Sequence, residues 1–482
     1  MTFKIFTIGW EPWLANNLLE PVTQKTGIQF VHGLVGDASR IDYAKQRYPN
    51  LNLVSLSKKH DEPLPAPDLE LLAHLESVGV STVKALIQGD RVLRHRTEEE
   101  TLGYTTLLAR NIKTALEAHR PDVVLGAYDS LHAGVGLSVA KSLDIPWVGL
   151  LFSTIPGSLI AFGNALTPNS LVPLTREIDK DLRNLARTLI QNVREKKQKV
   201  TDFQPPWSLK QWLRQYATNT RNFFRRKSEG ILGIDRFRFP TNIERIRDIV
   251  RRTCNRLRLP EKKMLREPPK ERFAFYPLHM APESSIDTWA PFYQNQLAFV
   301  AQLLLALPAD MTLVVKLHFA DPDNYDRKQL EQLMSMVQLR IAHPMAASAG
   351  FIEKADLVVG ITGTANLEAA LHGKPVLIFG DSPYVQFPNS ERARTPDELN
   401  QQIKHMLKLP SPTDEAITES FAAYMARFMP GCSNNWTLPI TDDDYERVSA
   451  CFNTLRYHLG NPVNRDNWYK QNPFVTNQKN ES

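Results

Sequence analysis

The sequence predicts an α/β protein made of two Rossmann-like domains that face each other across a cleft. Its 482 residues are too many for one ordinary hydrophobic core and fit two domains of about 200 residues each. Short apolar segments of strand length alternate with helical segments before residue 160 and again after residue 270. Near-continuous apolar strands joined by helices are typical of a parallel sheet that is covered on both faces.

The first domain is expected at residues 1–160. Its first helix should begin near Pro12 and end at Gly27. Leucine and isoleucine side chains that recur on one face predict a helix over 98–119, and a helix of small residues follows over 131–144. Strands are predicted at 3–9, 28–34, 51–57, 122–128 and 145–153.

The second domain is expected at residues 271–410, with further helices at 411–460 and a polar, disordered tail at 461–482. Gly373 should close the helix that follows the fourth strand. Thr395 and Glu398 have the spacing of a capping box for the next helix. Strands are predicted at 272–280, 312–318, 337–343, 356–362 and 375–380.

The composition indicates a globular, cytoplasmic protein. Hydrophobic residues make up 42% of the chain and charged residues 23%. The N-terminus lacks a basic region followed by a long apolar run, and no stretch approaches the roughly 18 apolar residues of a membrane span. The three cysteines match neither a zinc-site spacing nor a disulfide framework.

Residues 161–270 interrupt the strand–helix alternation and are predicted to be a basic, aromatic helical insertion that includes the interdomain connection. Residues 176–270 hold 26 Lys or Arg against 11 Asp or Glu, which leaves the rest of the chain with a net charge of −9. Residues 207–227 combine aromatic with basic side chains, a pattern suited to an anionic membrane surface such as the inner membrane. A solvated helix pair with its aromatic side chains in the core would have the same composition. Nucleic acid is not expected as a partner, because no RNA- or DNA-binding motif accompanies the charge.

Polar residues follow four successive strands of the second domain, where an open parallel sheet binds its ligands. The Gly and Thr residues that precede a helix leave backbone N–H groups free at a positive helix terminus, which is suited to phosphate. A Thr-Gly-Thr turn can equally be a plain helix cap, and a lone histidine is often structural. The candidate donor-binding residues are His279, Glu283, Lys316, His318, Thr362, Gly363, Thr364 and Glu368, and His343 is a weaker candidate.

The segments around these residues resemble the capsular polysaccharide biosynthesis family, which is similar to the transferases of the acid sugar Kdo. The shared pattern comprises Pro-Leu-His-x-x-Pro-Glu at 277–283, Lys316 with His318, and Thr-Gly-Thr followed by Glu-Ala at 362–369. The resemblance covers residues 270–385, and Phe319 stands where the family usually has proline. It implies the two-domain architecture called GT-B, in which the second domain binds a nucleotide-sugar donor.

In that architecture the first domain usually supplies a catalytic base for the acceptor hydroxyl. Glu11 follows the first strand and a Gly-Trp turn, and Asp129 follows the strand at 122–128. Either carboxylate could instead cap the next helix. His32, Asp37 and His132 are further candidates.

The resemblance and the residues together predict a glycosyltransferase that moves a sugar from a nucleotide-activated donor to a surface polysaccharide or glycolipid acceptor. No cofactor beyond the nucleotide sugar is expected. No metal is expected either, because no Asp-x-Asp pair follows a strand. A nucleotide-sugar 2-epimerase of the same architecture and a non-catalytic polysaccharide or membrane assembly factor are the alternatives.

Overall fold

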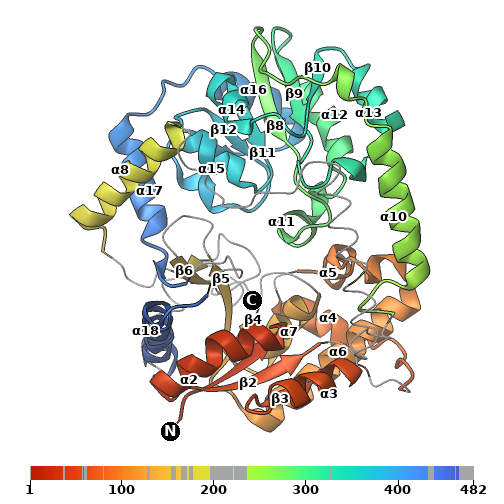
Figure 1. Ribbon diagram of the computed structural model, residues 1–482, viewed down its shortest axis with the longest axis vertical. Helices are drawn as coiled ribbons and strands as arrows, with labels where there is room; N and C mark the ends of the chain where they lie inside the picture. Colours follow the sequence, from red (N-terminus) through yellow and green to blue (C-terminus); the bar gives the residue numbers. More distant parts are fainter. Residues whose placement is uncertain are drawn as a thin grey trace. The chain divides into compact units, whose positions relative to one another are not determined.

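The computed structural model describes residues 2–465 except 36–37, 57, 59–61, 80, 127–130, 153–158, 164–170, 173–176, 196–220, 222–235, 326, 433–438 and 462. The chain forms two compact units, each with a sheet of its own (Figure 1). Unit 1 comprises Met1–Leu174, Pro206–Thr241 and Arg427–Ser482, and unit 2 comprises Thr175–Pro205 and Asn242–Ala426. No helix in the described part of the chain is both long and apolar enough to span a bilayer.

Unit 1 contains an eight-stranded sheet in the order β14-β6-β5-β4-β1-β2-β3, with β7 paired to β6. Strands β1 to β5 are parallel. Their order across the sheet is 3-2-1-4-5, as in a Rossmann fold. Their register places Phe6 of β1 beside Val31 of β2 and Val124 of β4. The strands are β1 (Lys4–Ile8), β2 (Gln29–Leu34), β3 (Leu53–Ser55), β4 (Val123–Gly126), β5 (Trp147–Phe152), β6 (Leu159–Gly163), β7 (Leu171–Val172) and β14 (Met429–Pro430).

Helices cover both faces of this sheet, because alternate residues of each strand point to opposite sides. Phe6 and Ile8 pack with α4, α5, α6 and α7, whereas Ile5 packs with α2 and α18. The helix predicted over 98–119 is confirmed as α6, which begins with a capping box between Thr97 and Glu100. The helices are α1 (Pro12–Leu14), a π-helical turn (Ala15–Leu19), α2 (Glu20–Thr26), α3 (Ala38–Arg47), α4 (Leu69–Val78), α5 (Val83–Gly89), α6 (Glu98–His119), α7 (Leu131–Ser142) and α18 (Asp442–Leu459).

The prediction that the chain is helical from residue 161 is wrong at β6 and β7. These strands extend the sheet in the antiparallel sense, with Leu150 of β5 beside Phe162 of β6. β14, which pairs with β6, comes from the C-terminal part of the chain. The pairing of β6 with β14 is long-range and could not be read from a local pattern, whereas β5, β6 and β7 are neighbours along the chain.

Unit 2 contains a six-stranded parallel sheet in the order β10-β9-β8-β11-β12-β13. Numbered from β8, the order is 3-2-1-4-5-6, which is that of a complete Rossmann fold. The two Rossmann-like halves predicted from the sequence are therefore confirmed. The strands are β8 (Phe273–Pro277), β9 (Thr312–Lys316), β10 (Leu339–Ala342), β11 (Leu357–Gly360), β12 (Val376–Ile378) and β13 (Ser390–Arg392).

One face of this sheet packs on α12, α13 and α16, and the rings of Phe275 and Phe351 stack on the other face at 5.3 Å. Thr395 is the N-cap residue of α16, but the predicted capping box does not form; the Thr395 hydroxyl bonds the Glu398 carboxylate instead. The helices are α8 (Lys180–Arg194), α10 (Asn242–Leu257), α11 (Ser284–Asp287), α12 (Gln296–Ala306), α13 (Arg327–Met334), α14 (Ser348–Lys354), α15 (Thr364–Leu371), α16 (Pro396–Met406) and α17 (Asp414–Met425).

Candidate functional site

The strand order of unit 2 reverses between β8 and β11, and this topological switch point is where ligands bind in open α/β sheets. The loop after β8 carries His279 and Glu283, and the turn after β11 carries Thr362 and Gly363. The structure therefore brings together four of the eight predicted donor-site residues at this edge.

A continuous hydrogen-bond chain joins the two loops. The Thr362 N–H donates to Nε2 of His279 at 3.4 Å, and Nδ1 of His279 lies 3.2 Å from the Ser285 hydroxyl. That hydroxyl donates to Oε2 of Glu283 at 2.7 Å, so Nδ1 of His279 must carry the proton that it shares with Ser285. The Thr362 hydroxyl donates to the Ser285 carbonyl at 2.8 Å. These bonds fix the turn after β11 against the loop after β8.

The imidazole of His279 is neutral in this arrangement. Burial, with a smaller contribution from nearby His318, lowers the pKa of His279 to about 3. A neutral ring can accept from Thr362 while donating to Ser285, whereas a charged ring could only donate. His279 is thus a positioning residue between two loops rather than a cation for phosphate.

Gln296, at the start of α12, holds the backbone of His279 from both sides. Its side-chain oxygen accepts from the His279 N–H at 2.8 Å, and its amide donates to the His279 carbonyl at 3.1 Å. The Gln296 side chain is buried, as is His279. The backbone of His279 is consequently fixed before any ligand arrives.

Helix α15 begins at Thr364 beside this network. The N–H groups of Thr364 and Ala365 have no acceptor within the helix, and the helix dipole adds partial positive charge there. Gly363 allows close approach, because a Cβ atom at this position would lie 3.1 Å from Cε1 of His279. Glu368 is half-buried one turn further along the helix. This terminus can bind an anionic group such as phosphate.

Lys316 and His318 lie at the end of β9, but neither presents a positive charge to solvent. The Lys316 side chain is buried and its ammonium donates to the Pro344 carbonyl at 3.0 Å, so we assign Lys316 to the support of these loops. Burial, reinforced by Lys316, lowers the pKa of His318 to about 4. Nδ1 of His343 accepts from the Met345 N–H at 3.0 Å within its own turn. Phosphate binding by backbone amides is therefore better supported than binding by these side chains.

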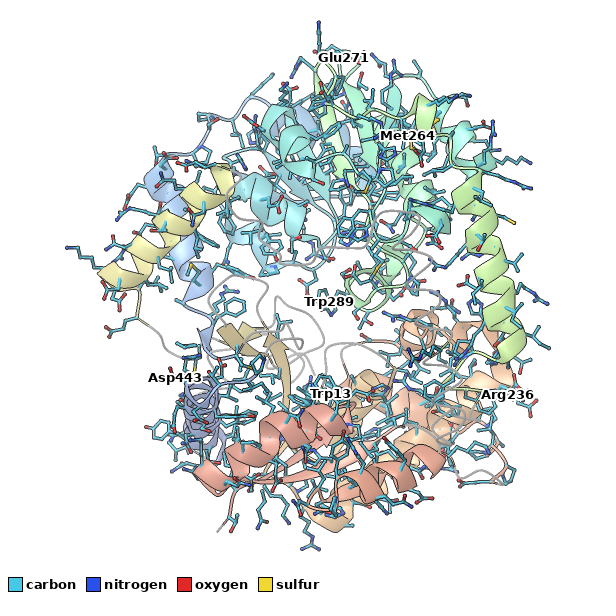
Figure 2. The ribbon with its side chains drawn as sticks, viewed as in Figure 1. Trp13, Arg236, Met264, Glu271, Trp289 and Asp443 are labelled. Carbon is cyan, nitrogen blue, oxygen red and sulfur yellow. The ribbon has the colours of Figure 1, made fainter. Side chains whose placement is uncertain are left out.

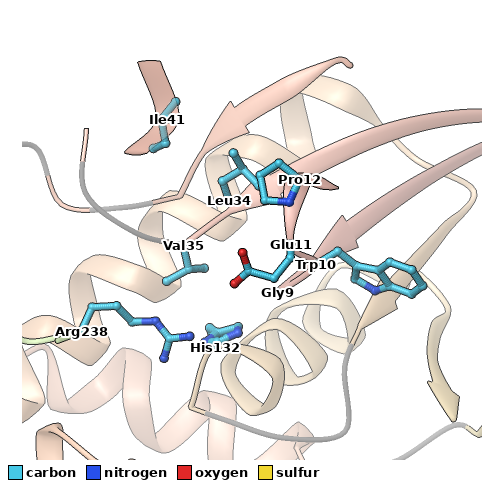
Figure 3. Close-up of a pocket in the computed structure, with 9 residues that line it drawn as sticks. All are labelled: Gly9, Trp10, Glu11, Pro12, Leu34, Val35, Ile41, His132 and Arg238. Carbon is cyan, nitrogen blue, oxygen red and sulfur yellow. The ribbon is translucent and has the colours of Figure 1, made fainter. Parts of the chain in front are cut away.

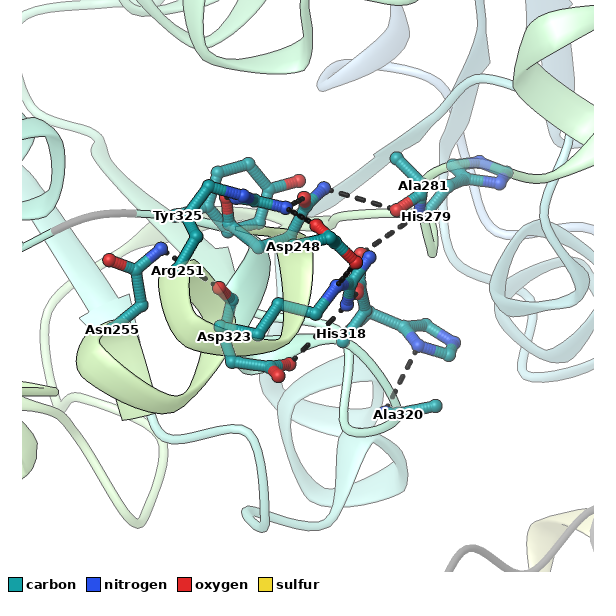
Figure 4. Close-up of polar contacts among 12 residues, drawn as sticks. Asp248, Arg251, Asn255, His279, Ala281, His318, Ala320, Asp323 and Tyr325 are labelled. Carbon is teal, nitrogen blue, oxygen red and sulfur yellow. Dashed lines mark hydrogen bonds and ion pairs between the residues drawn. The ribbon is translucent and has the colours of Figure 1, made fainter. Parts of the chain in front are cut away.

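Contacts from α10 fix the other end of the loop after β8 (Figure 4). Arg252 donates to Asp321 at 2.5 Å, and the other oxygen of Asp321 accepts from the Ala281 N–H at 3.1 Å. The Asn324 side chain donates to the Ala281 carbonyl at 3.1 Å. The loop that carries His279 and Glu283 is thus held by buried contacts at His279 and by part-buried contacts at Ala281.

Unit 1 has its own small pocket at the switch point between β1 and β4, lined by Glu11, His132 and Arg238 among others (Figure 3). Gly9 has a φ of 82° and turns the chain directly after β1, so that the Glu11 carboxylate reaches the pocket. The Glu11 side chain does not cap α1. Burial, and then the nearby Arg238 guanidinium, hold the pKa of His132 well below its usual range. The pocket thus combines a carboxylate, a neutral imidazole and a guanidinium.

His32, a further first-domain candidate, is a described residue that does not line this pocket. His32 is buried within β2, where Nδ1 lies 2.9 Å from the Thr7 hydroxyl. Burial lowers the pKa of His32 to about 4. Asp37 and Asp129 lie outside the described residues, as do residues 207–227 apart from Arg221.

Three site residues were missed from the sequence: Ser285, Gln296 and Arg238. Ser285 lies two residues beyond the Pro-Glu pair at 282–283, which was the nearest available signal. Gln296 and Arg238 reach their sites through tertiary folding, and no local pattern marks them. In the described part of the chain, Nε of Arg238 has no hydrogen-bond partner, and Nη1 of Arg238 lies 4.0 Å from Oδ2 of Asp90.

No known protein-family profile matches the sequence, and no curated protein matches it. The predicted resemblance to the capsular polysaccharide family thus gains no support from sequence. Among solved structures, the chain is similar to the KpsC β-Kdo 2,7 transferase of Thermosulfurimonas dismutans, with 10% identity over 95% of this chain and 100% of that chain and a TM-score of 0.37.

It is also similar to MnaA of S. aureus in a structure with UDP, with 13% identity over 95% of this chain and 96% of that chain and a TM-score of 0.29. For the UDP-GlcNAc 2-epimerase of Methanocaldococcus jannaschii the identity is 13%, the coverage 88% and 98%, and the TM-score 0.26. TM-scores this low do not identify a function.

Proposed function

We propose that the chain is a glycosyltransferase that moves a sugar from a nucleotide-activated donor to a polysaccharide or glycolipid acceptor in capsule-type glycan synthesis. The observation that carries the proposal is the switch point of unit 2. There the start of α15 is joined to the loop after β8 through His279, Ser285 and Glu283. A preorganised anion site of this kind is what an activated sugar requires.

The donor phosphate would bind the free N–H groups at the start of α15. These groups and the helix dipole stabilise the negative charge that grows on phosphate as the sugar departs. Asn366, in the first turn of α15, is buried, and neither of its side-chain polar atoms has a hydrogen-bond partner among the described residues. Glu368 would accept hydrogen bonds from sugar or ribose hydroxyl groups.

Glu11 would act as the base toward the acceptor. Its carboxylate takes the proton of an acceptor hydroxyl while the oxygen forms a bond to the anomeric carbon of the donor. The bond between that carbon and the phosphate oxygen breaks, and the phosphate keeps the electron pair. Asp129 remains the second candidate for this role. We also propose that no metal takes part, so that a chelator leaves the transfer rate unchanged.

Thermal-shift measurements with CMP-, UDP-, GDP- and dTDP-sugars test the donor site. We expect at least one nucleotide sugar to raise the unfolding temperature of the wild type. The same nucleotide sugar should not raise the unfolding temperature of Gly363→Val, because the new side chain would meet the His279 ring and fill the approach to α15. Gly350→Ala is the matched control, since the nearest atom to its new Cβ is 4.0 Å away. A panel with no stabilising nucleotide sugar, or an equal response in all three proteins, would contradict the proposal.

Product analysis with and without acceptor separates the alternatives. A transferase consumes its donor productively only when an acceptor is present, whereas an epimerase converts the donor alone. A non-catalytic assembly factor would keep its cellular function after Glu11→Gln.

A further inference from the structure

Helix α10 has an apolar face that is exposed to solvent. Ile243 is 70% exposed, Ile246 62%, Val250 56% and Leu257 74%. Their spacings of three, four and seven residues put these four side chains on one face of the helix. A helix at the surface of a unit normally turns such a face inward.

The opposite face of α10 is polar and makes the contacts with unit 2. Arg252 pairs with Asp321 at 2.5 Å, the Asn255 amide donates to the Asp323 carbonyl at 3.0 Å, and Arg251 donates to the Asn324 carbonyl at 3.1 Å (Figure 4). At about 100° per residue, the centres of the contact face and the apolar face lie about 155° apart. The apolar face therefore points away from the unit that carries it, and side chains project along the whole helix (Figure 2).

Arginines border the apolar face on both sides. The same angular spacing puts Arg247 along one border, and Arg258 follows in the turn directly after the helix. It puts Arg245 and Arg256, which are both half-buried, along the other border. Residues 242–257 contain five arginines and two acidic residues, so the helix is basic overall. An exposed aliphatic stripe between two rows of arginine is the pattern of a helix that lies in a membrane interface.

We propose that α10 lies in the headgroup layer of an anionic lipid bilayer, with its aliphatic side chains among the acyl chains and its bordering arginines at the lipid phosphates. Charge complementarity selects this occupant. A second copy of α10 would bring arginine rows against arginine rows, which repel. Residues 207–227 of this chain carry six basic residues and no acidic one, so they too would be repelled.

Vesicle co-sedimentation of the full chain tests this surface. We expect binding to phosphatidylcholine vesicles that contain phosphatidylglycerol, and weak binding to phosphatidylcholine alone. Ile246→Gln with Val250→Gln should weaken binding about tenfold or more, and Arg247→Gln about fivefold. Glutamine favours a helix at least as well as isoleucine or valine, so the fold should persist. Leu305→Gln, which removes an 86%-exposed leucine from α12, is the matched control and should bind as the wild type.

The unfolding temperature and the response to nucleotide sugars should be the same in all variants, which separates this inference from the donor-site proposal. Three results would overturn it. The first is vesicle binding that the α10 substitutions do not change. Vesicle binding that is lost only when residues 207–227 are altered counts as the same result. The second is equal binding to neutral vesicles. The third is a dimer, or a complex with an acidic protein, that dissociates on Ile246→Gln with Val250→Gln while vesicle binding persists.

Discussion

Replacing Gln296 with leucine removes both hydrogen bonds that fix the backbone of His279. The N–H and the carbonyl of His279 are paired to Gln296 at 2.8 Å and 3.1 Å in a buried position. Each buried backbone group left without a partner costs about 1–3 kcal/mol. Allowing for the apolar contacts that leucine gains, we expect the free energy of unfolding of unit 2 to fall by about 3 kcal/mol. That loss corresponds to a fall in unfolding temperature of about 6–12 °C.

Gln402 provides a control for stability alone. It is buried in the same unit, and its side chain also bonds backbone groups, the Arg394 N–H at 3.0 Å and the Arg392 carbonyl at 2.8 Å. Gln402→Leu should therefore cost a similar free energy in urea unfolding. Only Gln296→Leu should also reduce the thermal shift that a nucleotide sugar produces. If both variants reduced the shift equally, or if neither did, the positioning role of the loop after β8 would be refuted.

Glu11→Gln should lower the transfer rate about 10²–10⁴-fold and leave the donor-induced thermal shift intact, whereas Glu20→Gln should leave both intact; an active Glu11→Gln protein would exclude Glu11 as the base. Because burial lowers the pKa of His279 to about 3 from an ordinary 6.5, its neutral form stabilises the fold above pH 6.5. That stability is lost as the pH falls toward 3, by about 1.4 kcal/mol per pH unit. His279→Asn should make the pH dependence of stability shallower by this contribution, while His32 and His318, whose pKa values are also lowered, keep theirs. If urea unfolding gave the same pH dependence for both proteins, His279 would be protonated without cost. Asp321→Asn removes the charge opposite Arg252 and should lower the free energy of unfolding by about 3 kcal/mol; an unchanged midpoint would show that the pair adds no net stability.

The elements could be predicted where their own residues determine them. The five strands predicted in each domain are present, and α6 spans Glu98–His119, as its apolar periodicity predicts. β6 and β7 were missed although their partners β5 and β6 lie close along the chain, whereas the pairing of β6 with β14 is long-range. The packing of α18 against Phe30 and Phe162 of unit 1 is another long-range outcome, since no signal near residue 450 indicates which sheet it covers.

The candidate site was predicted in its location but not in its chemistry. The rule that ligands bind beyond strand ends correctly brought His279, Glu283, Thr362 and Gly363 to one edge. The protonation of His279 depends on burial and on Ser285, and neither can be read from spacing. Lys316 illustrates the same limit, since only the fold shows that its ammonium donates to the Pro344 and Leu317 carbonyls.

The central claim is that backbone amides at the start of α15 bind the phosphate of an activated sugar. A crystal structure of the complex with whichever nucleotide sugar stabilises the protein tests it most directly. We predict phosphate oxygens within hydrogen-bond distance of the Thr364 and Ala365 N–H groups, with the network between His279 and Glu283 unchanged. A nucleotide bound away from the β8–β11 edge, or phosphate held only by side chains, would contradict the account.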